Sequence, residues 1–223
     1  PSVLHWHGDC LVVEIDEWSV PIPRPVRGEI RIRPQVRPAG SYTLDPGGRH
    51  RWTPLAPSAQ VCVRLQRPRL RWQGRGYLDH NAGDGPLERD FSHWHWSRSA
   101  PDARGRTTVY YDLAPRHGPR HGLALGFGAD GGVERLELPG AVALPRSGWG
   151  IGRTARTARA TPTVERTLED TPFYARSLLR LDGDGGTADV IHESLSLDRF
   201  ATPWVRALLP FRMPRRRGPA PRG

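Results

Sequence analysis

Two pairs of side chains in the sequence have types and spacing suited to chemistry. Tyr77 and Asp79 are separated by one residue, and His50 and Trp52 repeat that spacing upstream. In an extended strand, side chains two positions apart lie on one face, about 7 Å from each other. The two pairs could therefore line a pocket in which acid–base groups lie beside aromatic rings. The alternative is that the rings are core aromatics and that Asp79 bonds turn amides.

Histidine pairs raise the possibility of a metal site. His5 and His7 form one His-x-His pair, His93 and His95 form another, and His80 lies nearby in the sequence. A strand that carries His-x-His can bind zinc, iron or copper, but a catalytic metal needs a third ligand. No spacing in the chain indicates that ligand, so we predict no bound metal.

Other catalytic motifs are missing from the sequence. There is no Gly-x-Ser-x-Gly, and neither Cys10 nor Cys62 lies in a nucleophile motif. There is no phosphate-binding loop or dinucleotide fingerprint either. Two cysteines exclude a disulfide scaffold and a cysteine-only zinc site, although one bridge between them stays possible.

The elements that must position these residues are predicted to be strands. The chain contains 25 glycines and 23 prolines, which lie between short segments. In these segments apolar residues recur at every second position. Such spacing of short strands is typical of a sandwich or a barrel. The predicted strands cover 11–15, 29–33, 61–65, 107–113 and 188–197, with turns at 45–48, 130–132 and 182–186. One short amphipathic helix is expected over 203–209, followed by a basic tail.

The charge of the chain leaves several partner classes open. All 33 basic residues are Arg, and with 23 acidic residues they give a formal charge of +10. This excess fits nucleic acid, an anionic membrane or a bias in codon usage. Because the arginines are spread through every segment, we predict no nucleic-acid partner. No apolar run of about 18 residues predicts a membrane-spanning helix, and no signal-peptide pattern opens the chain.

Long motifs in the sequence resemble one family, the carotenoid 1,2-hydratases, also called hydroxyneurosporene synthases. The resemblance is carried by Gly76–Glu88 and Trp94–Arg98, and it continues downstream through 166–176, 192–200 and 210–214. It extends from about Leu4 onward and so covers nearly the whole chain. The chain begins Pro1-Ser2-Val3 without Met, and the N-terminal segment of the family is expected before Pro1.

The resemblance implies an all-β fold of lipocalin-like (calycin-type) antiparallel β-barrels, either two packed barrels or one barrel and a partial one. Residues 1–55 would then be the end of a first β domain that is truncated at its N-terminus. Residues 56–205 would form a second lipocalin-like domain, and 206–223 would be a basic Pro/Arg tail.

The resemblance also implies an activity. These enzymes add water across the terminal C1–C2 double bond of acyclic carotenoids such as neurosporene and lycopene, giving a tertiary alcohol without an organic cofactor or a metal. The functional residues of the family match His50, Trp52, Tyr77 and Asp79.

The chemistry of hydration suggests a role for each of these four residues. Proton transfer to carbon would leave a tertiary carbocation, and we expect Asp79, kept uncharged by apolar surroundings, to be the proton donor. Trp52 and Tyr77 would present their π-faces to the cation. His50 would hold or deprotonate the attacking water. The opposite assignment, with His50 as acid and Asp79 as base, stays open.

A long hydrocarbon substrate predicts contact with a membrane. We expect peripheral association on the cytoplasmic side of a membrane, through 204–211 and the Arg tail. The alternatives are a non-catalytic binder of carotenoid or another apolar ligand, a metal enzyme, and a related cyclisation or isomerisation on the same scaffold. The sequence does not indicate an oligomeric state.

Overall fold

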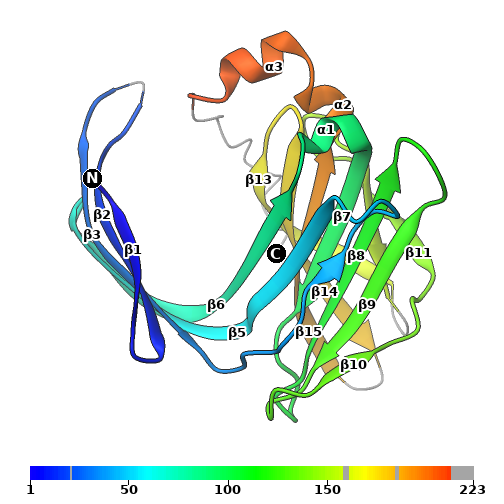
Figure 1. The fold of residues 1–223 in the computed structure, drawn as a ribbon, viewed down its shortest axis with the longest axis horizontal. Helices are drawn as coiled ribbons and strands as arrows, with labels where there is room; N and C mark the ends of the chain where they lie inside the picture. Colours follow the sequence, from blue (N-terminus) through cyan, green and yellow to red (C-terminus); the bar gives the residue numbers. More distant parts are fainter. Residues whose placement is uncertain (21, 158–160, 184–185, 212–223) are drawn as a thin grey trace, which may run out of the picture.

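The computed structural model describes residues 1–20, 22–157, 161–183 and 186–211 of the 223-residue chain. In this part of the chain, antiparallel strands form two large sheets and one two-stranded sheet. The two large sheets lie on either side of the molecule and are joined by the long strands β5 and β6 (Figure 1). No described helix is long and apolar enough to cross a bilayer.

The N-terminal sheet has the order β1-β2-β3-β5-β4, with β6 paired to β5. It curves away from the rest of the molecule (Figure 1). Its strands are β1 (Val3–His7), β2 (Cys10–Trp18), β3 (Pro25–Pro34), β4 (Tyr42–Thr43), β5 (His50–Arg67) and β6 (Leu70–Gly83).

The C-terminal sheet has the order β10-β9-β8-β7-β15-β14-β13. Its strands are β7 (Phe91–Ser99), β8 (Thr107–Pro115), β9 (His121–Phe127), β10 (Val133–Arg135), β13 (Pro162–Asp170), β14 (Tyr174–Gly183) and β15 (Gly186–Ser196). The small sheet pairs β11 (Ala141–Leu144) with β12 (Arg153–Arg156). Three short helices, α1 (Leu87–Asp90), α2 (Leu197–Phe200) and α3 (Pro203–Leu208), lie together at one end of the molecule (Figure 1).

The main core lies between the C-terminal sheet and the ends of β5 and β6. From Thr107 to Leu113 of β8 every second residue is buried, so Val109, Tyr111 and Leu113 point to one face while the residues between them are partly exposed. This period of two is what a strand with one covered face requires. Trp52 from β5 and Phe91 from β7 complete the same buried cluster. The core therefore fixes the ends of β5 and β6 against the C-terminal sheet.

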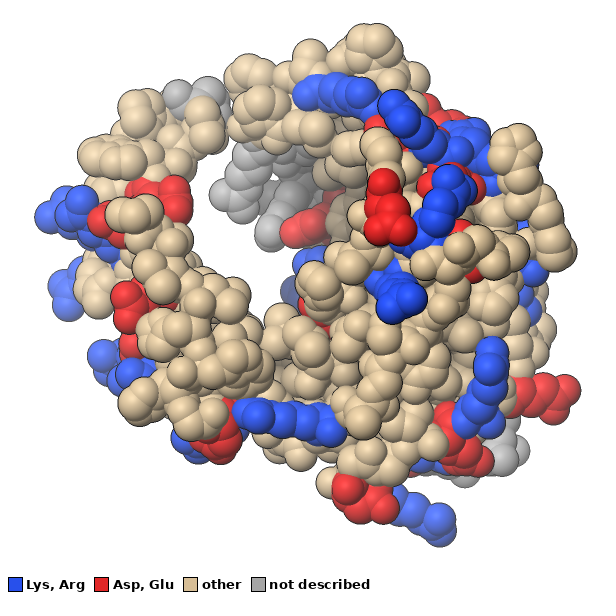
Figure 2. Space-filling view, viewed as in Figure 1, with Lys and Arg blue, Asp and Glu red and all other residues tan. Residues whose placement is uncertain are grey.

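The N-terminal sheet has an apolar face that is partly uncovered. Directly opposed residues point to the same side, and one row across five strands consists of Leu4, Val13, Ile30, Val63 and Trp72. Leu4 is 63% exposed and Trp72 is 45% exposed, whereas Val63 is buried. Figure 2 shows an open hollow between this sheet and the rest of the molecule.

The structure confirms the predicted all-β, antiparallel character, but the strand pairings of the described residues form open sheets and no closed barrel. The five predicted strands lie within β2, β3, β5, β8 and β15, with only Leu197 passing into α2. The helix expected over 203–209 is α3. At two of the predicted turns, Gly48 and Gly131 adopt φ values of 70° and 89°, which favour glycine.

The predicted division into domains stays a prediction. Its boundary between residues 55 and 56 falls inside β5, which runs from His50 to Arg67 and pairs with β6 along both halves. Part of the predicted tail, 206–208, belongs to α3. Residues 212–223, with most of the arginines of that tail, lie outside the described residues.

Candidate active site

The pairing of β5 with β6 positions the candidate site. Trp52 is opposite Asn81 and Pro54 is opposite Asp79, and the register shifts between Pro54 and Ala56 and again between Ala56 and Ala59. Proline lacks the N–H that a strand pairing needs, so the prolines of β5 favour irregular pairing at these points. Such bulges bend a strand and re-aim its side chains. They occur beside the position of Asp79.

Asp79 accepts two hydrogen bonds on a single carboxyl oxygen. The indole Nε1 of Trp52 donates to Oδ2 at 2.7 Å, and the phenol of Tyr77 donates to the same atom at 3.0 Å. Among the described residues, no hydrogen bond ends on Oδ1. The two donors therefore fix the orientation of the carboxyl and leave Oδ1 as the oxygen that can carry a proton.

The two donors are held by aromatic packing. Trp52 is fully buried, with ring centroids 5.7 Å from Tyr42 and 5.7 Å from Tyr111, and the Tyr77 ring lies 4.8 Å from Trp96. Burial, and next the neighbouring Asp79, raise the pKa of Tyr77, so the phenol stays protonated and remains a donor. The site is thus a half-buried carboxyl surrounded by aromatic rings.

Arg98 brings a positive charge to the same region. Its guanidinium carbon lies 5.6 Å from the centroid of the Tyr77 ring, and Nη1 donates to the carbonyl of Pro57 at 3.0 Å. The residue is 8% exposed, and burial lowers its pKa. Arg98 belongs to the motif that resembles the hydratase family, but nothing in its type or spacing indicated that it would lie against Tyr77.

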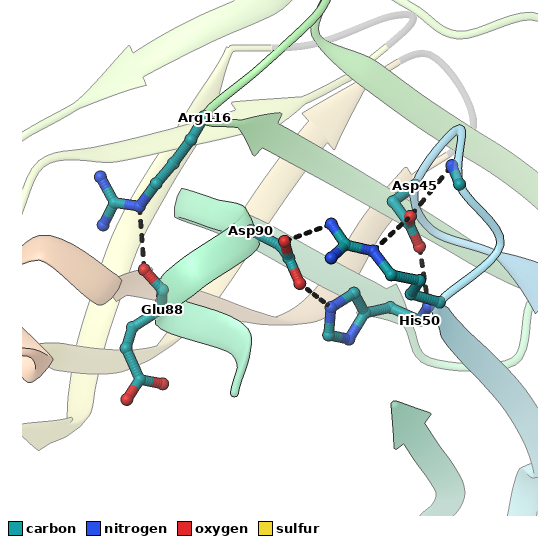
Figure 3. A network of polar contacts seen from close by, with 7 residues as sticks. Asp45, His50, Glu88, Asp90 and Arg116 are labelled. Atoms are coloured by element: carbon teal, nitrogen blue, oxygen red, sulfur yellow. Dashed lines mark hydrogen bonds and ion pairs between the residues drawn. The ribbon is translucent and has the colours of Figure 1, made fainter. Parts of the chain in front are cut away.

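His50 lies at the start of β5 and forms a different set of contacts. It is 1% exposed, and its Nε2 lies 2.6 Å from Oδ2 of Asp90. Its backbone N–H donates to Oδ1 of Asp45 at 2.7 Å, and Arg49 bonds the other oxygen of Asp90 (Figure 3). Three of the four predicted site residues are thus joined by hydrogen bonds, while His50 is held by Asp90 instead.

Asp90 is the residue that sequence reasoning missed. The hydrogen bond from His50, and the charge of Arg49, lower the pKa of Asp90 against the opposing effect of desolvation. Asp90 ends α1, 40 residues after His50 in the sequence. A carboxylate just after the family motif was visible in the sequence, but only the folding of α1 against β5 brings it to His50.

The two His-x-His pairs lie on different strands and in different surroundings. His95 stacks on His192 with ring centroids 6.1 Å apart, and its Nδ1 lies 2.9 Å from the hydroxyl of Ser194. His93 lies beside His95, at 5.6 Å between ring centroids. His5 lies exposed on β1. The described residues contain no group of three or more histidines, cysteines and carboxylates placed to hold a metal ion.

Burial keeps the stacked histidine pair uncharged. Desolvation, and next the charge of the other histidine, lower the pKa of His95 to about 3. Desolvation also lowers the pKa of His192 to about 4. Both imidazoles are therefore neutral at physiological pH and belong to the packing on the other face of β7 from Trp94 and Trp96.

Comparisons with known proteins agree with the resemblance seen in the motifs. The chain is 50% identical over 217 residues to the acyclic carotenoid 1,2-hydratase of Thiocapsa roseopersicina, covering 96% of this chain and 53% of that protein. It is 36% identical over 221 residues to the enzyme of the same name from Rhodobacter capsulatus, covering 98% and 78%. The chain thus spans about half the length of the Thiocapsa relative.

A solved structure supports the fold alone. Kievitone hydratase from Nectria haematococca superposes with a TM-score of 0.55 at 12% identity, over 85% of this chain and 66% of that one.

The sequence model of the family described as carotenoid hydratase CrtC matches residues 1–221. With relatives at this level of identity along nearly its whole length, the chain belongs to the carotenoid hydratase CrtC family.

Proposed function

We propose that this chain carries the chemistry of an acyclic carotenoid 1,2-hydratase, a hydro-lyase that adds water to the terminal double bond of a linear carotenoid. The observation that carries the proposal is the carboxyl of Asp79, held by Trp52 and Tyr77 inside an aromatic cluster, in a chain that is 50% identical to an acyclic carotenoid 1,2-hydratase.

Asp79 is the proton donor in this proposal. Hydration of an unactivated alkene begins when a proton is transferred to carbon, which leaves a tertiary carbocation. An apolar chain end against the carboxyl would remove water from it and favour its uncharged form. Because both donated hydrogen bonds end on Oδ2, the transferable proton is assigned to Oδ1.

The aromatic rings stabilise the cation. Trp52 and Tyr77 bond the carboxyl and Trp96 packs on Tyr77, and the face of an aromatic ring attracts a desolvated cation by about 2 kcal/mol. Water then bonds to the carbocation and passes one proton to His50. That proton returns to Asp79 through solvent, so that the alkene has gained one hydrogen and one hydroxyl in total.

The decisive experiment replaces the proton donor. Asp79→Asn keeps the size of the side chain and the acceptor for Trp52 and Tyr77, but it cannot protonate carbon. General acid catalysis contributes about 10²–10⁴-fold, so the variant should lose that much turnover of lycopene or neurosporene in detergent. Products are measured by mass spectrometry as the gain of one water. Asp84→Asn, an exposed carboxyl beyond the end of β6, is the matched control.

Two results would contradict the proposal. Unchanged turnover by Asp79→Asn would remove Asp79 as the acid. Tight binding of the pigment without any hydrated product would instead indicate a carotenoid-binding protein.

We also propose that α3 and the residues after it contact a membrane. Trp204 (53%), Leu209 (49%) and Phe211 (49%) are exposed, and Arg206 lies among them. Exposed apolar side chains beside a basic residue suit the interface of an anionic bilayer. Trp204→Ala should therefore weaken co-sedimentation with anionic vesicles, while Trp18→Ala, which removes a tryptophan that is 62% exposed in the N-terminal sheet, should not.

The barrel arrangement implied by the family resemblance is likewise proposed for the longer relatives. The curvature of the N-terminal sheet supports it (Figure 1). A crystal structure of a full-length relative that showed flat, separate sheets would contradict it.

A further inference from the structure

The carboxylate of Asp90 determines which imidazole nitrogen of His50 carries hydrogen. Oδ2 of Asp90 lies 2.6 Å from Nε2 of His50. An ionised carboxylate accepts hydrogen bonds and cannot donate one, so Nε2 must be the N–H of the ring. The hydrogen bond from His50, and next the charge of Arg49, lower the pKa of Asp90, which agrees with an ionised carboxylate.

Arg49 fixes the orientation of that carboxylate. Nη2 of Arg49 bonds Oδ1 of Asp90, while Oδ2 faces His50. Arg49 Nε in turn lies 3.9 Å from Oδ2 of Asp45, whose Oδ1 accepts the backbone N–H of His50 (Figure 3). Each carboxylate oxygen of Asp90 therefore has one partner, and the carboxylate cannot rotate without losing its contacts with both Arg49 and His50.

The other ring nitrogen has no partner. Nδ1 of His50 is buried and forms no hydrogen bond with the described residues. It lies against Gly83 of β6, where an added Cβ would be only 2.4 Å away. Any side chain at position 83 would therefore collide with Nδ1, so glycine lets β6 pack against the imidazole while Nδ1 keeps a lone pair that no described residue occupies.

We propose that Asp90 is a positioning residue of the hydration site: it holds the hydrogen of His50 on Nε2 and so leaves Nδ1 as the atom that takes a proton from the attacking water. This inference rests on the hydratase function proposed above. When the oxygen of water bonds to the carbocation, the released proton passes to Nδ1. The adjacent carboxylate stabilises the imidazolium that forms, as the aspartate does in hydrolase triads.

Asp90→Asn tests the assignment through a predicted change of tautomer. Arg49 requires an acceptor, so the amide oxygen should take the place of Oδ1 and the NH₂ should face His50. The amide would then donate to Nε2 and move the ring hydrogen to Nδ1. Two-bond nitrogen–proton correlation spectra distinguish the two tautomers, and the signals of His50 are identified by their loss in His50→Gln.

The expected result is an Nε2–H tautomer in the unaltered protein and an Nδ1–H tautomer in Asp90→Asn. The kcat for hydration should fall about 10- to 100-fold, as for other groups that orient a histidine, with little change in KM. Asp198→Asn makes the same substitution in a carboxylate that bonds Arg116 instead. It should change neither the tautomer nor kcat.

Gly83→Ala provides a second variant that leaves Asp90 in place. Its methyl group would press on Nδ1, so kcat should fall while the hydrogen stays on Nε2. An Nδ1–H tautomer in the unaltered protein, full activity of Asp90→Asn, or full activity of Gly83→Ala would each overturn the inference. Absence of hydration by the unaltered protein would overturn the proposed function itself, and the spectra would still show whether Asp90 sets the tautomer.

Discussion

At the scale of single residues, the chemistry depends on how the two oxygens of one carboxyl are used. Oδ2 of Asp79 holds the two hydrogen bonds that orient the group, and Oδ1 carries the proton in the proposed mechanism. The donors are the polar atoms of two rings whose faces stabilise the cation in the same proposed mechanism. That mechanism therefore gives Trp52 and Tyr77 two roles each, and these can be separated by substitution.

Tyr77→Phe keeps the ring and removes one hydrogen bond to Asp79. In the proposed mechanism Asp79 becomes a carboxylate as it gives up its proton, and a hydrogen bond to a charged group contributes about 1.5–3 kcal/mol, so kcat should fall about 10-fold or more while the fold is kept. Turnover of lycopene and thermal unfolding measure the two effects. Tyr110→Phe, on the opposite face of β8 from Tyr111, is the control. Equal losses in both variants would show that the effect is not specific to Asp79.

Residue spacing predicted that Tyr77 and Asp79 lie together, but it did not predict the contact between His50 and Asp90. Tyr77 and Asp79 share a strand face, as their separation by one residue requires, and their hydrogen bond confirms the shared environment. The contact between His50 and Asp90 spans 40 residues. No local pattern carries that information, because it depends on how α1 packs against the start of β5.

At the scale of elements, β5 and β6 approach each other closely beside the site. A Cβ added at Gly76 would lie 2.2 Å from Cγ2 of Val61, directly before Tyr77 in the sequence. The strand period placed the five predicted strands within β2, β3, β5, β8 and β15, since alternation reflects one buried face. It could not predict the bulges at Pro54 and Ala56, which depend on the partner strand.

Gly76→Ala should overpack this contact. Overpacking costs about 1–3 kcal/mol, so the free energy of unfolding in urea should fall by that amount. Adding Val61→Ala removes the colliding methyl groups, and the double variant should be more stable than Gly76→Ala alone. If the two substitutions were simply additive, the close approach would not be the cause.

The stacked pair of His95 and His192 should make stability depend on pH. Their pKa values are lowered to about 3 and about 4, below the 6.5 of an unfolded histidine. Between these values the unfolded chain binds more protons, so stability falls as the pH decreases below about 6.5. A single such histidine costs about 2 kcal/mol between pH 7 and pH 5.

Urea unfolding at pH 7 and pH 5 measures this dependence. His95→Gln should reduce the difference between the two pH values, whatever its effect on stability at pH 7. Ser194→Ala removes the hydrogen bond to His95 but keeps the imidazole, and it should leave the difference in place. A pH dependence that was identical in His95→Gln would exclude this histidine as the cause.

At the scale of the whole molecule, charge and apolar surface are distributed differently. Arginines and acidic residues are interspersed around the face seen in Figure 2, which does not show one continuous basic patch. Exposed apolar side chains instead gather on the N-terminal sheet, including Leu4, Trp6 and Trp72. Monomeric proteins rarely leave such patches in contact with water.

The chain should therefore associate through this sheet. Sedimentation velocity should show concentration-dependent oligomers, and the double variant Trp6→Gln/Trp72→Gln should sediment more nearly as a monomer. Trp149→Gln, which removes a tryptophan that is 36% exposed between β11 and β12, is the control. A strictly monomeric unaltered chain would contradict the prediction.

The two longest strands, β5 and β6, belong at one end to the N-terminal sheet and at the other to the aromatic cluster around Asp79. From Trp72 to Asp79 the backbone extends roughly 23 Å, at about 3.3 Å for each residue. Backbone pairing joins β5 and β6 along this length. In the proposed function, this strand pair places the exposed apolar face of the N-terminal sheet and the carboxyl of Asp79 along one continuous path, on which an extended hydrocarbon would contact both.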